Sequence, residues 1–133
     1  MTADNYGLTH YDIHHGNYLL EPDGNIILFD FEMACQSWYA HEIGNVLYYA
    51  LLVPEMEGRE AWFLNAFLEA YFKENSMPKE ELEKIPSYLL YRALLVYAYI
   101  CKIWTAEQLT PRNKAYKERL ENSILLRRKI LGL

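Results

Sequence analysis

The turn sequence Pro22-Asp23-Gly24-Asn25, placed between two short apolar runs, is the feature that most constrains the fold of this 133-residue chain. Such a turn between β-type runs predicts a hairpin, with strands at residues 17–21 and 26–30. If the turn takes all four residues, Asn17 lies opposite Asp30. Directly opposed residues have Cβ atoms about 5 Å apart. We therefore expect an amide and a carboxylate to meet at the open end of the hairpin.

After residue 38 the spacing of apolar residues becomes helical, and five helices are expected, over residues 41–52, 59–75, 78–85, 87–108 and 112–130. Pro78 and Pro111 stand where proline fits a first helical turn. The 87–108 segment is apolar on nearly all sides, which predicts a central, buried helix. In the last helix we expect three residues to face inward, Leu120, Ile124 and Leu125. The predicted class is α+β and mainly helical, one hairpin followed by four or five helices.

Composition excludes several classes of protein. Apolar residues make up 52% of the chain and aromatic residues 15%, enough to build a core. The two cysteines, Cys35 and Cys101, are far apart, which argues against a disulfide framework or a zinc ribbon. No apolar leader opens the chain, and charges interrupt its longest apolar run. We expect a cytoplasmic protein without a membrane span.

The charge is unevenly distributed along the chain. Residues 1–109 carry a net charge of -10, and residues 110–133 carry +5. An acidic body disfavours general nucleic-acid binding and is compatible with a metal ion or a cationic small molecule. The basic end is interpreted as the solvated face of a helix.

The polar residues around the hairpin follow a recognisable order. Asp12 lies five residues before Asn17, so with Asp30 three oxygen-bearing side chains are expected near one another. Oxygen ligands of this kind suit a hard divalent cation such as Mg2+. On spacing alone, a solvated strand end is the ordinary alternative. However, His10-Tyr11-Asp12-x-x-x-x-Asn17 has the spacing of the kinase catalytic loop H-R-D-x-x-x-x-N, and Asp30-Phe31-Glu32 stands where D-F-G would.

The stretches "HYDIHHGNYLL", "ILFDFE" and "WYAHEIG" resemble the aminoglycoside phosphotransferase family, kinase-like enzymes that act on small molecules and include choline- and homoserine-kinase relatives. The resemblance is specific over residues 8–52. It implies the C-terminal lobe of a protein-kinase-like fold, with the catalytic loop, hairpin and metal-binding segment in residues 1–40 and a helical subdomain in residues 41–133. The implied reaction moves the terminal phosphate of ATP or GTP to a hydroxyl of a small molecule.

The resemblance also implies roles for particular residues. Asp12 would be the catalytic base for the substrate hydroxyl. Asn17 and Asp30 would hold the Mg2+ that binds the nucleotide phosphates, and Glu32 is a further candidate ligand. In this chemistry, positioning and electrostatics supply most of the rate.

A second group of residues would support the loop or line the substrate site. His10 would be a buried anchor, and Glu42 would tie the catalytic loop to the following helix, where the family has an aspartate. His14, Trp38 and Tyr39 are candidates for a wall of the substrate site.

The chain departs from the family pattern at Tyr11, where the family has a glycine, and this ring either crowds the site or packs inward. It also lacks the glycine-rich loop and the lysine that contact nucleotide phosphates in a kinase. We therefore expect the N-terminal nucleotide lobe to be absent and the chain alone to be inactive.

Three other interpretations remain open at this point. A truncated lobe could be a non-catalytic interaction module that forms a homodimer through its exposed lobe interface. His10, His14, His15 and Asp12 could instead form the metal site of a hydrolase. The many tyrosines could form a cage for a choline-like cation, although core packing is the more ordinary role of such rings.

Overall fold

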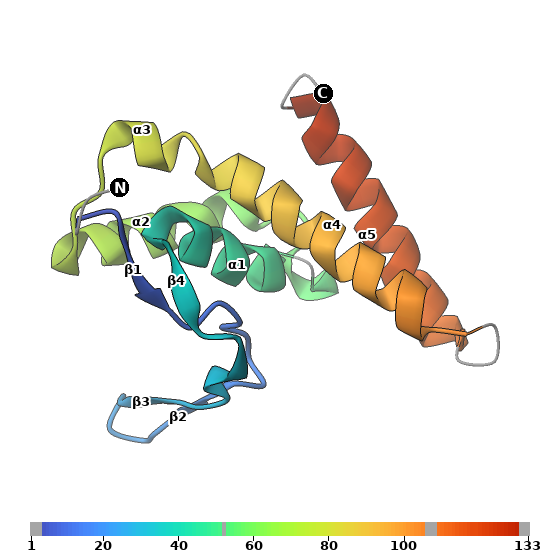
Figure 1. The fold of residues 1–133 in the computed structure, drawn as a ribbon, viewed down its shortest axis with the longest axis horizontal. Helices are drawn as coiled ribbons and strands as arrows, with labels where there is room; N and C mark the ends of the chain where they lie inside the picture. Colours follow the sequence, from blue (N-terminus) through green and yellow to red (C-terminus); the bar gives the residue numbers. More distant parts are fainter. Residues whose placement is uncertain (1–3, 52, 106–108, 131–133) are drawn as a thin grey trace.

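The computed structural model describes residues 4–51, 53–105 and 109–130. Its strands are β1 (Tyr6–Thr9), β2 (Tyr18–Leu20), β3 (Ile26–Leu28) and β4 (Cys35–Trp38). Its α-helices are α1 (Tyr39–Leu51), α2 (Glu60–Glu74), α3 (Lys79–Leu82), α4 (Ile85–Ile103) and α5 (Pro111–Ile130), with short 3-10 helices η1 (Phe31–Met33) and η2 (Pro54–Met56) (Figure 1). The predicted class, α+β and mainly helical, is confirmed. None of the described helices is long and apolar enough to cross a membrane.

The predicted hairpin forms from β2 and β3, but its register differs by one residue from our prediction. The Glu21 N–H donates to the Asn25 carbonyl at 2.8 Å, so the loop contains three residues and not four. Gly24 supplies the left-handed residue that such a loop needs, with φ of 92°. As a result, the Phe29 N–H donates to the Asn17 carbonyl at 3.1 Å. The prediction that Asn17 lies opposite Asp30 was therefore wrong.

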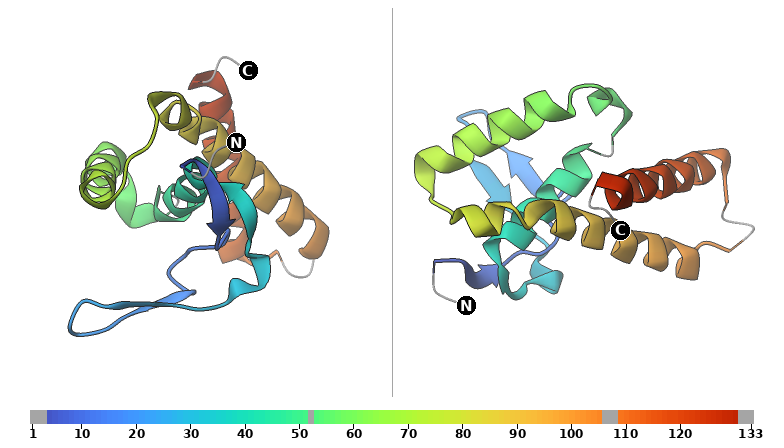
Figure 2. Two further views of the ribbon diagram at one scale, coloured as in Figure 1. Left: turned by 60° about the vertical axis from the view of Figure 1, so that its left-hand side comes forward. Right: turned by 90° about the horizontal axis from the view of Figure 1, so that it is seen from above.

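A second two-stranded sheet, formed by β1 and β4, was not predicted. The strands pair antiparallel, with Tyr6 opposite Trp38 and Thr9 opposite Cys35. The Thr9 hydroxyl adds a hydrogen bond to the Cys35 carbonyl at 3.0 Å. This sheet joins the start of the loop after β1 to the start of α1, whereas the β2–β3 hairpin extends away from the helices (Figures 1 and 2).

The centre of the helical part is the crossing of α1 and α4. Both helices contribute buried apolar side chains to one core, Ala40, Ile43, Leu47, Leu89, Leu90 and Ala93. Gly44 lies at the crossing, where an added Cβ would be 2.8 Å from the Tyr88 Cβ. The close approach of the two helices therefore depends on the absence of a side chain at this position.

The prediction of a central helix buried on all sides was wrong for α4. Its Leu94, Leu95 and Tyr99 side chains are exposed, because the described chain covers α4 on the side of α1 and α5 and leaves another side open (Figure 2). In α5, Leu120 and Ile124 are buried as expected, but Leu125 is 61% exposed. The predicted helix ends at residues 52 and 108 lie outside the described residues.

Replacing Gly44 by alanine should destabilise the fold by about 1–3 kcal/mol, because the new methyl group overpacks the α1–α4 crossing. Urea unfolding followed by circular dichroism measures this change. Asn65→Ala is the matched control, since it places the same residue on an exposed face of α2. An unchanged unfolding midpoint for Gly44→Ala would show that the helices separate at no cost.

Candidate active site

The backbone N–H groups of the loop after β1 are held to α1 by one carboxylate. Glu42, in the first turn of α1, accepts the His10 N–H at 2.7 Å through Oε1 and the Tyr11 N–H at 2.9 Å through Oε2. Hydrogen bonds from backbone amides to an ionised carboxylate are short and strong. The two bonds fix the orientation of the peptide groups that directly precede Asp12.

Tyr11 has a left-handed backbone, with φ of 68°. This conformation costs an L-residue roughly 1–2 kcal/mol and costs glycine almost nothing, which explains why a glycine suits this position. Asn45 in α1 donates to the Tyr11 carbonyl at 3.0 Å. The Tyr11 ring packs against the His41 ring, with centroids 4.7 Å apart, and lies 6.0 Å from the Arg92 guanidinium carbon. The ring therefore packs inward.

The Asp12 carboxylate lies where the loop, the hairpin, α1 and α4 converge. Its Oδ1 accepts hydrogen bonds from the Tyr49 hydroxyl at 3.0 Å and from Arg92. Its Oδ2 is 3.4 Å from the Asn17 amide nitrogen and 3.6 Å from Nε2 of His14. One oxygen is thus fully engaged by the helices, and the other faces the loop and the partly exposed side of the site.

Sequence reasoning missed Arg92 and Tyr49 as members of this site. The Arg92 side chain is 5% exposed and also donates to the Tyr49 hydroxyl at 2.6 Å. Burial raises the pKa of Tyr49 to about 12, partly opposed by Arg92, so the phenol keeps its proton for Asp12. A lone arginine in an apolar helix was the available signal, because buried charges are nearly always paired. The sequence does not identify its partner, 80 residues away.

The structure places Asn17 beside Asp12, but it does not place Asp30 opposite Asn17. Asn17 is buried, and its amide nitrogen donates to the Asp12 carbonyl at 3.0 Å. Asp30 is exposed and left-handed, with φ of 65°, and Glu32 is exposed on η1. His10 links the loop to the end of β3, since its Nε2 is 2.8 Å from the Phe29 carbonyl. A hard divalent cation binds amide and carboxylate oxygens. The side chains of Asn17, Asp30 and Glu32 therefore carry the kinds of ligand atom that suit Mg2+.

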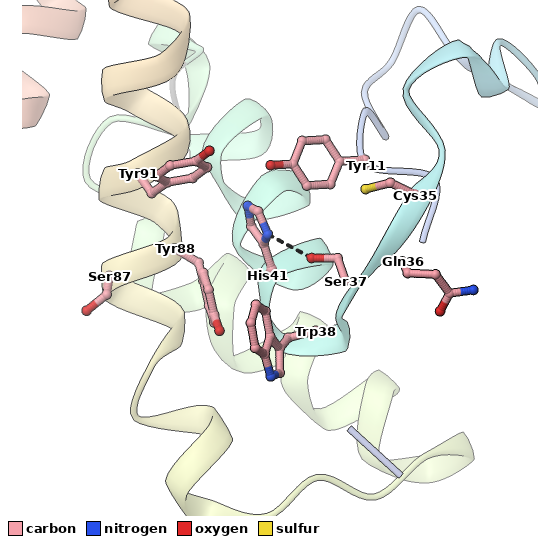
Figure 3. Close-up of a pocket in the computed structure, with 9 residues that line it drawn as sticks. All are labelled: Tyr11, Cys35, Gln36, Ser37, Trp38, His41, Ser87, Tyr88 and Tyr91. Carbon is pink, nitrogen blue, oxygen red and sulfur yellow. Dashed lines mark hydrogen bonds between the residues drawn. The ribbon is translucent and has the colours of Figure 1, made fainter. Parts of the chain in front are cut away.

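The three candidates for a substrate wall lie in three different places. His14 lies beside Asp12, with its ring 4.9 Å from the Tyr49 ring. Trp38 lines a cavity of about 480 Å³ between β4, α1 and α4 (Figure 3). Tyr39 lines a second cavity, of about 240 Å³, together with Glu42 and Tyr71. Of these three candidates, only His14 thus lies near the Asp12 carboxylate.

The histidines do not form a shared metal site. His10 contacts the Phe29 carbonyl, His14 lies beside Asp12, and the His15 ring is 5.8 Å from the His14 ring. Within the described ranges, no three His, Cys, Asp or Glu side chains are grouped so that they could hold a metal ion together. The metal-hydrolase interpretation therefore gains no support from the geometry.

Comparison with known sequences gives one matching family model and two relatives. The sequence model of the phosphotransferase enzyme family matches residues 2–84. Amicoumacin kinase of Bacillus subtilis (strain 168) is 34% identical over 104 residues, which are 74% of this chain and 31% of the relative. An uncharacterized protein of Deinococcus radiodurans is 30% identical over 93 residues, 67% of this chain and 26% of that protein. The chain thus spans about a third or less of the length of these relatives.

Two solved structures have the same fold over most of this chain. Amicoumacin kinase hAmiN, in complex with AMP-PNP, Ca2+ and Ami, aligns with a TM-score of 0.78 and 30% identity over 93% of this chain and 38% of its own. A microcompartment-associated aminopropanol kinase aligns with a TM-score of 0.74 and 22% identity over 97% of this chain and 38% of its own. The prediction of a kinase-like fold, seen here in part, is confirmed.

Replacing Glu42 by glutamine should destabilise the chain by about 1–3 kcal/mol, because the amide keeps one acceptor oxygen for two backbone donors. Urea unfolding measures the change. Glu69→Gln is the matched control, since this exposed carboxylate makes an i,i+4 pair with Lys73, and such a pair should contribute less than about 0.5 kcal/mol. Equal effects of the two substitutions would contradict the anchoring role of Glu42.

Proposed function

The chain belongs to the phosphotransferase enzyme family, and on this premise we propose that it forms the C-terminal lobe of a small-molecule O-phosphotransferase. The enzyme transfers the terminal phosphate of ATP or GTP to a substrate hydroxyl in the cytoplasm. The observation that carries this proposal is the Asp12 carboxylate, which has one oxygen engaged by Tyr49 and Arg92 and the other directed toward Asn17 and His14.

In the proposed mechanism, Asp12 orients the substrate hydroxyl and accepts its proton as the oxygen attacks the phosphate. A base in this role must be held in place before the substrate binds. The bonds from Tyr49 and Arg92 to Oδ1 do this and leave Oδ2 for the hydroxyl. Glu42 and His10 hold the loop and the end of β3 in position, so they act on the reaction through Asp12 and Asp30.

Asn17 and Asp30 are proposed to hold Mg2+, and Glu32 is a further candidate. When bound, the metal would neutralise charge on the nucleotide phosphates. The contribution of Asn17 follows from its orientation: its amide nitrogen is used by the Asp12 carbonyl, which leaves the amide oxygen for a cation. The relative hAmiN, in complex with AMP-PNP and Ca2+, supports a nucleotide and a divalent cation as the ligands of this family.

The catalytic unit is proposed to be larger than these 133 residues, because the chain corresponds to 31% of Bacillus subtilis amicoumacin kinase and its sequence has no glycine-rich loop or phosphate-binding lysine. The chain alone should therefore show no phosphotransfer. Nucleotide-dependent phosphotransfer measured with the purified chain alone would contradict this part of the proposal.

The test of the function is a segment exchange, in which this chain replaces its matching region in Bacillus subtilis amicoumacin kinase. We expect Mg2+-dependent ATP consumption in the presence of amicoumacin. Asp12→Asn should lower kcat by roughly 10²- to 10⁴-fold with little effect on KM, because it removes the base and keeps the shape of the side chain.

Asp23→Asn is the matched control, since it makes the same chemical change in the exposed hairpin turn, and its kcat should be unchanged. Equal activity of the Asp12→Asn exchange protein and its parent would contradict the assigned base. Suppose that the exchange protein folds and binds nucleotide, yet consumes no ATP with amicoumacin or other small molecules that carry a hydroxyl. That result would contradict the proposal that this chain is the C-terminal lobe of a phosphotransferase.

A second candidate function, an interaction or homodimer surface, is favoured by the exposure of the hairpin. Large apolar side chains are exposed on both faces of the β2–β3 hairpin, where Leu19 pairs with Ile27 and Leu20 with Ile26, and on η1, namely Leu19, Leu20, Ile26, Ile27, Phe31 and Met33. Contiguous exposed apolar residues of this kind commonly mark a contact surface. We propose that the isolated chain self-associates through this hairpin surface.

Light scattering at high protein concentration should give the mass of a dimer. Leu20→Lys should shift the mass to that of a monomer, because a lysine in the hairpin surface must be desolvated on association. Leu125→Lys is the control, since it adds the same charge to an exposed site on α5. A strictly monomeric parent chain would contradict the self-association.

A further inference from the structure

The larger of the two cavities, of about 480 Å³, is not lined by Asp12 or by the residues that contact its carboxylate. It lies between β4, the first turn of α1 and α4 (Figure 3). Its lining residues are Tyr11, Cys35, Gln36, Ser37, Trp38, His41, Ser87, Tyr88 and Tyr91. Its volume is within the range of small-molecule sites, roughly 300–1,000 Å³.

His41, which lines this cavity, has an unused hydrogen-bonding atom. The residue is 6% exposed, and its Nδ1 is paired with the Ser37 hydroxyl at 3.0 Å. Its Nε2 is buried and has no hydrogen-bond partner. In Figure 3 this nitrogen lies on the side of the ring that faces Tyr11 and Tyr91. Buried ring nitrogens are almost always paired, so the open position is informative.

Four of the other eight lining residues contribute flat rings. The Tyr88 ring stacks on His41 at 4.8 Å with an interplanar angle of 18°, and Trp38 stacks on Tyr88 at 6.4 Å and 26°. Tyr11 and Tyr91 meet His41 edge-on, at 4.7 and 5.4 Å. Aromatic faces and edges in this arrangement favour another planar ring over a bulky aliphatic group.

The wall carries no net charge. Burial, together with the nearby Arg92, lowers the pKa of His41, and burial with a hydrogen bond to Tyr91 raises the pKa of Tyr11 to about 12. None of the nine lining residues is an acid, a lysine or an arginine. The Arg92 guanidinium carbon lies 6.0 Å from the centre of the Tyr11 ring and disfavours a cation, while an anion finds no ion partner in the wall.

We infer that this cavity binds an uncharged planar aromatic group with a hydrogen-bonding substituent, which pairs with His41 Nε2. The Tyr91 side chain borders this nitrogen, and the residue is 47% exposed. Rotation of an exposed side chain is fast enough to admit the ligand. The inference does not rest on the proposed phosphotransfer, because none of the residues that line the cavity contacts the Asp12 carboxylate.

The test uses four probes of nearly equal size with the 133-residue chain: benzamide, benzoate, benzamidinium and cyclohexanecarboxamide. Binding is followed by the NMR signals of the Trp38 indole and the His41 ring. We expect benzamide to bind about five- to tenfold more tightly than each of the others. It alone is planar and uncharged and can either donate a hydrogen bond to His41 Nε2 or accept one from it, whichever tautomer is present. Tightest binding of an ion or of the non-planar amide, or no binding by any probe, would overturn the inference.

Two variants separate the hydrogen bond from the aromatic wall. His41→Phe keeps a ring and removes Nε2, and should weaken benzamide binding about five- to tenfold. Trp38→Leu, at a position that is 36% exposed, should weaken it by a similar factor and serves if His41→Phe fails to fold. Trp62→Leu, at an exposed position on α2 outside the cavity, is the control. Unchanged binding by Trp38→Leu would place the probe elsewhere and overturn the inference.

Discussion

The arrangement of the site depends first on the Glu42 carboxylate, which accepts two consecutive backbone N–H groups from the loop after β1. Those donors belong to His10 and Tyr11, and the left-handed backbone of Tyr11 sets the direction in which Asp12 leaves the loop. Because Glu42 lies in the first turn of α1, the loop is positioned relative to that helix and to everything packed on it. The crossing of α1 and α4 at Gly44 then brings a residue of each helix, Tyr49 and Arg92, to the same carboxylate oxygen.

Arg92 connects the helical core to the loop at an energetic cost. Burying a guanidinium is unfavourable unless it is paired and hydrogen-bonded. Asp12 and the Tyr49 hydroxyl supply those bonds, the Tyr49 ring lies 5.2 Å from the guanidinium carbon, and Nε remains without a partner. Such a pair adds little net stability, but removing either member leaves an uncompensated buried charge. Its effect is therefore to allow one arrangement of loop and helices and to disfavour others.

Features of the fold that depend on local spacing could be predicted from the sequence, and those that depend on distant pairing could not. The hairpin, the succession of helices and the kinase-like loop follow from residues close together in the chain. The β1–β4 sheet joins residues about thirty positions apart through short, mixed strands, which carry no periodic signal. The hairpin register was missed because Gly24 permits a three-residue loop, and one residue of slip moves every pairing. Arg92 was missed because its partner is set by the crossing of two helices.

Tyr11 links the two sites. A glycine would adopt the left-handed backbone at no cost, whereas tyrosine at φ of 68° carries roughly 1–2 kcal/mol of strain. Its side chain offsets that strain through contacts with His41, Tyr91 and Arg92. The same ring forms a wall of the aromatic cavity, while its backbone N–H and carbonyl hold the loop that carries Asp12. A molecule that displaces this ring must therefore act on the backbone next to Asp12. A glycine at this position would leave the loop and the cavity independent of each other.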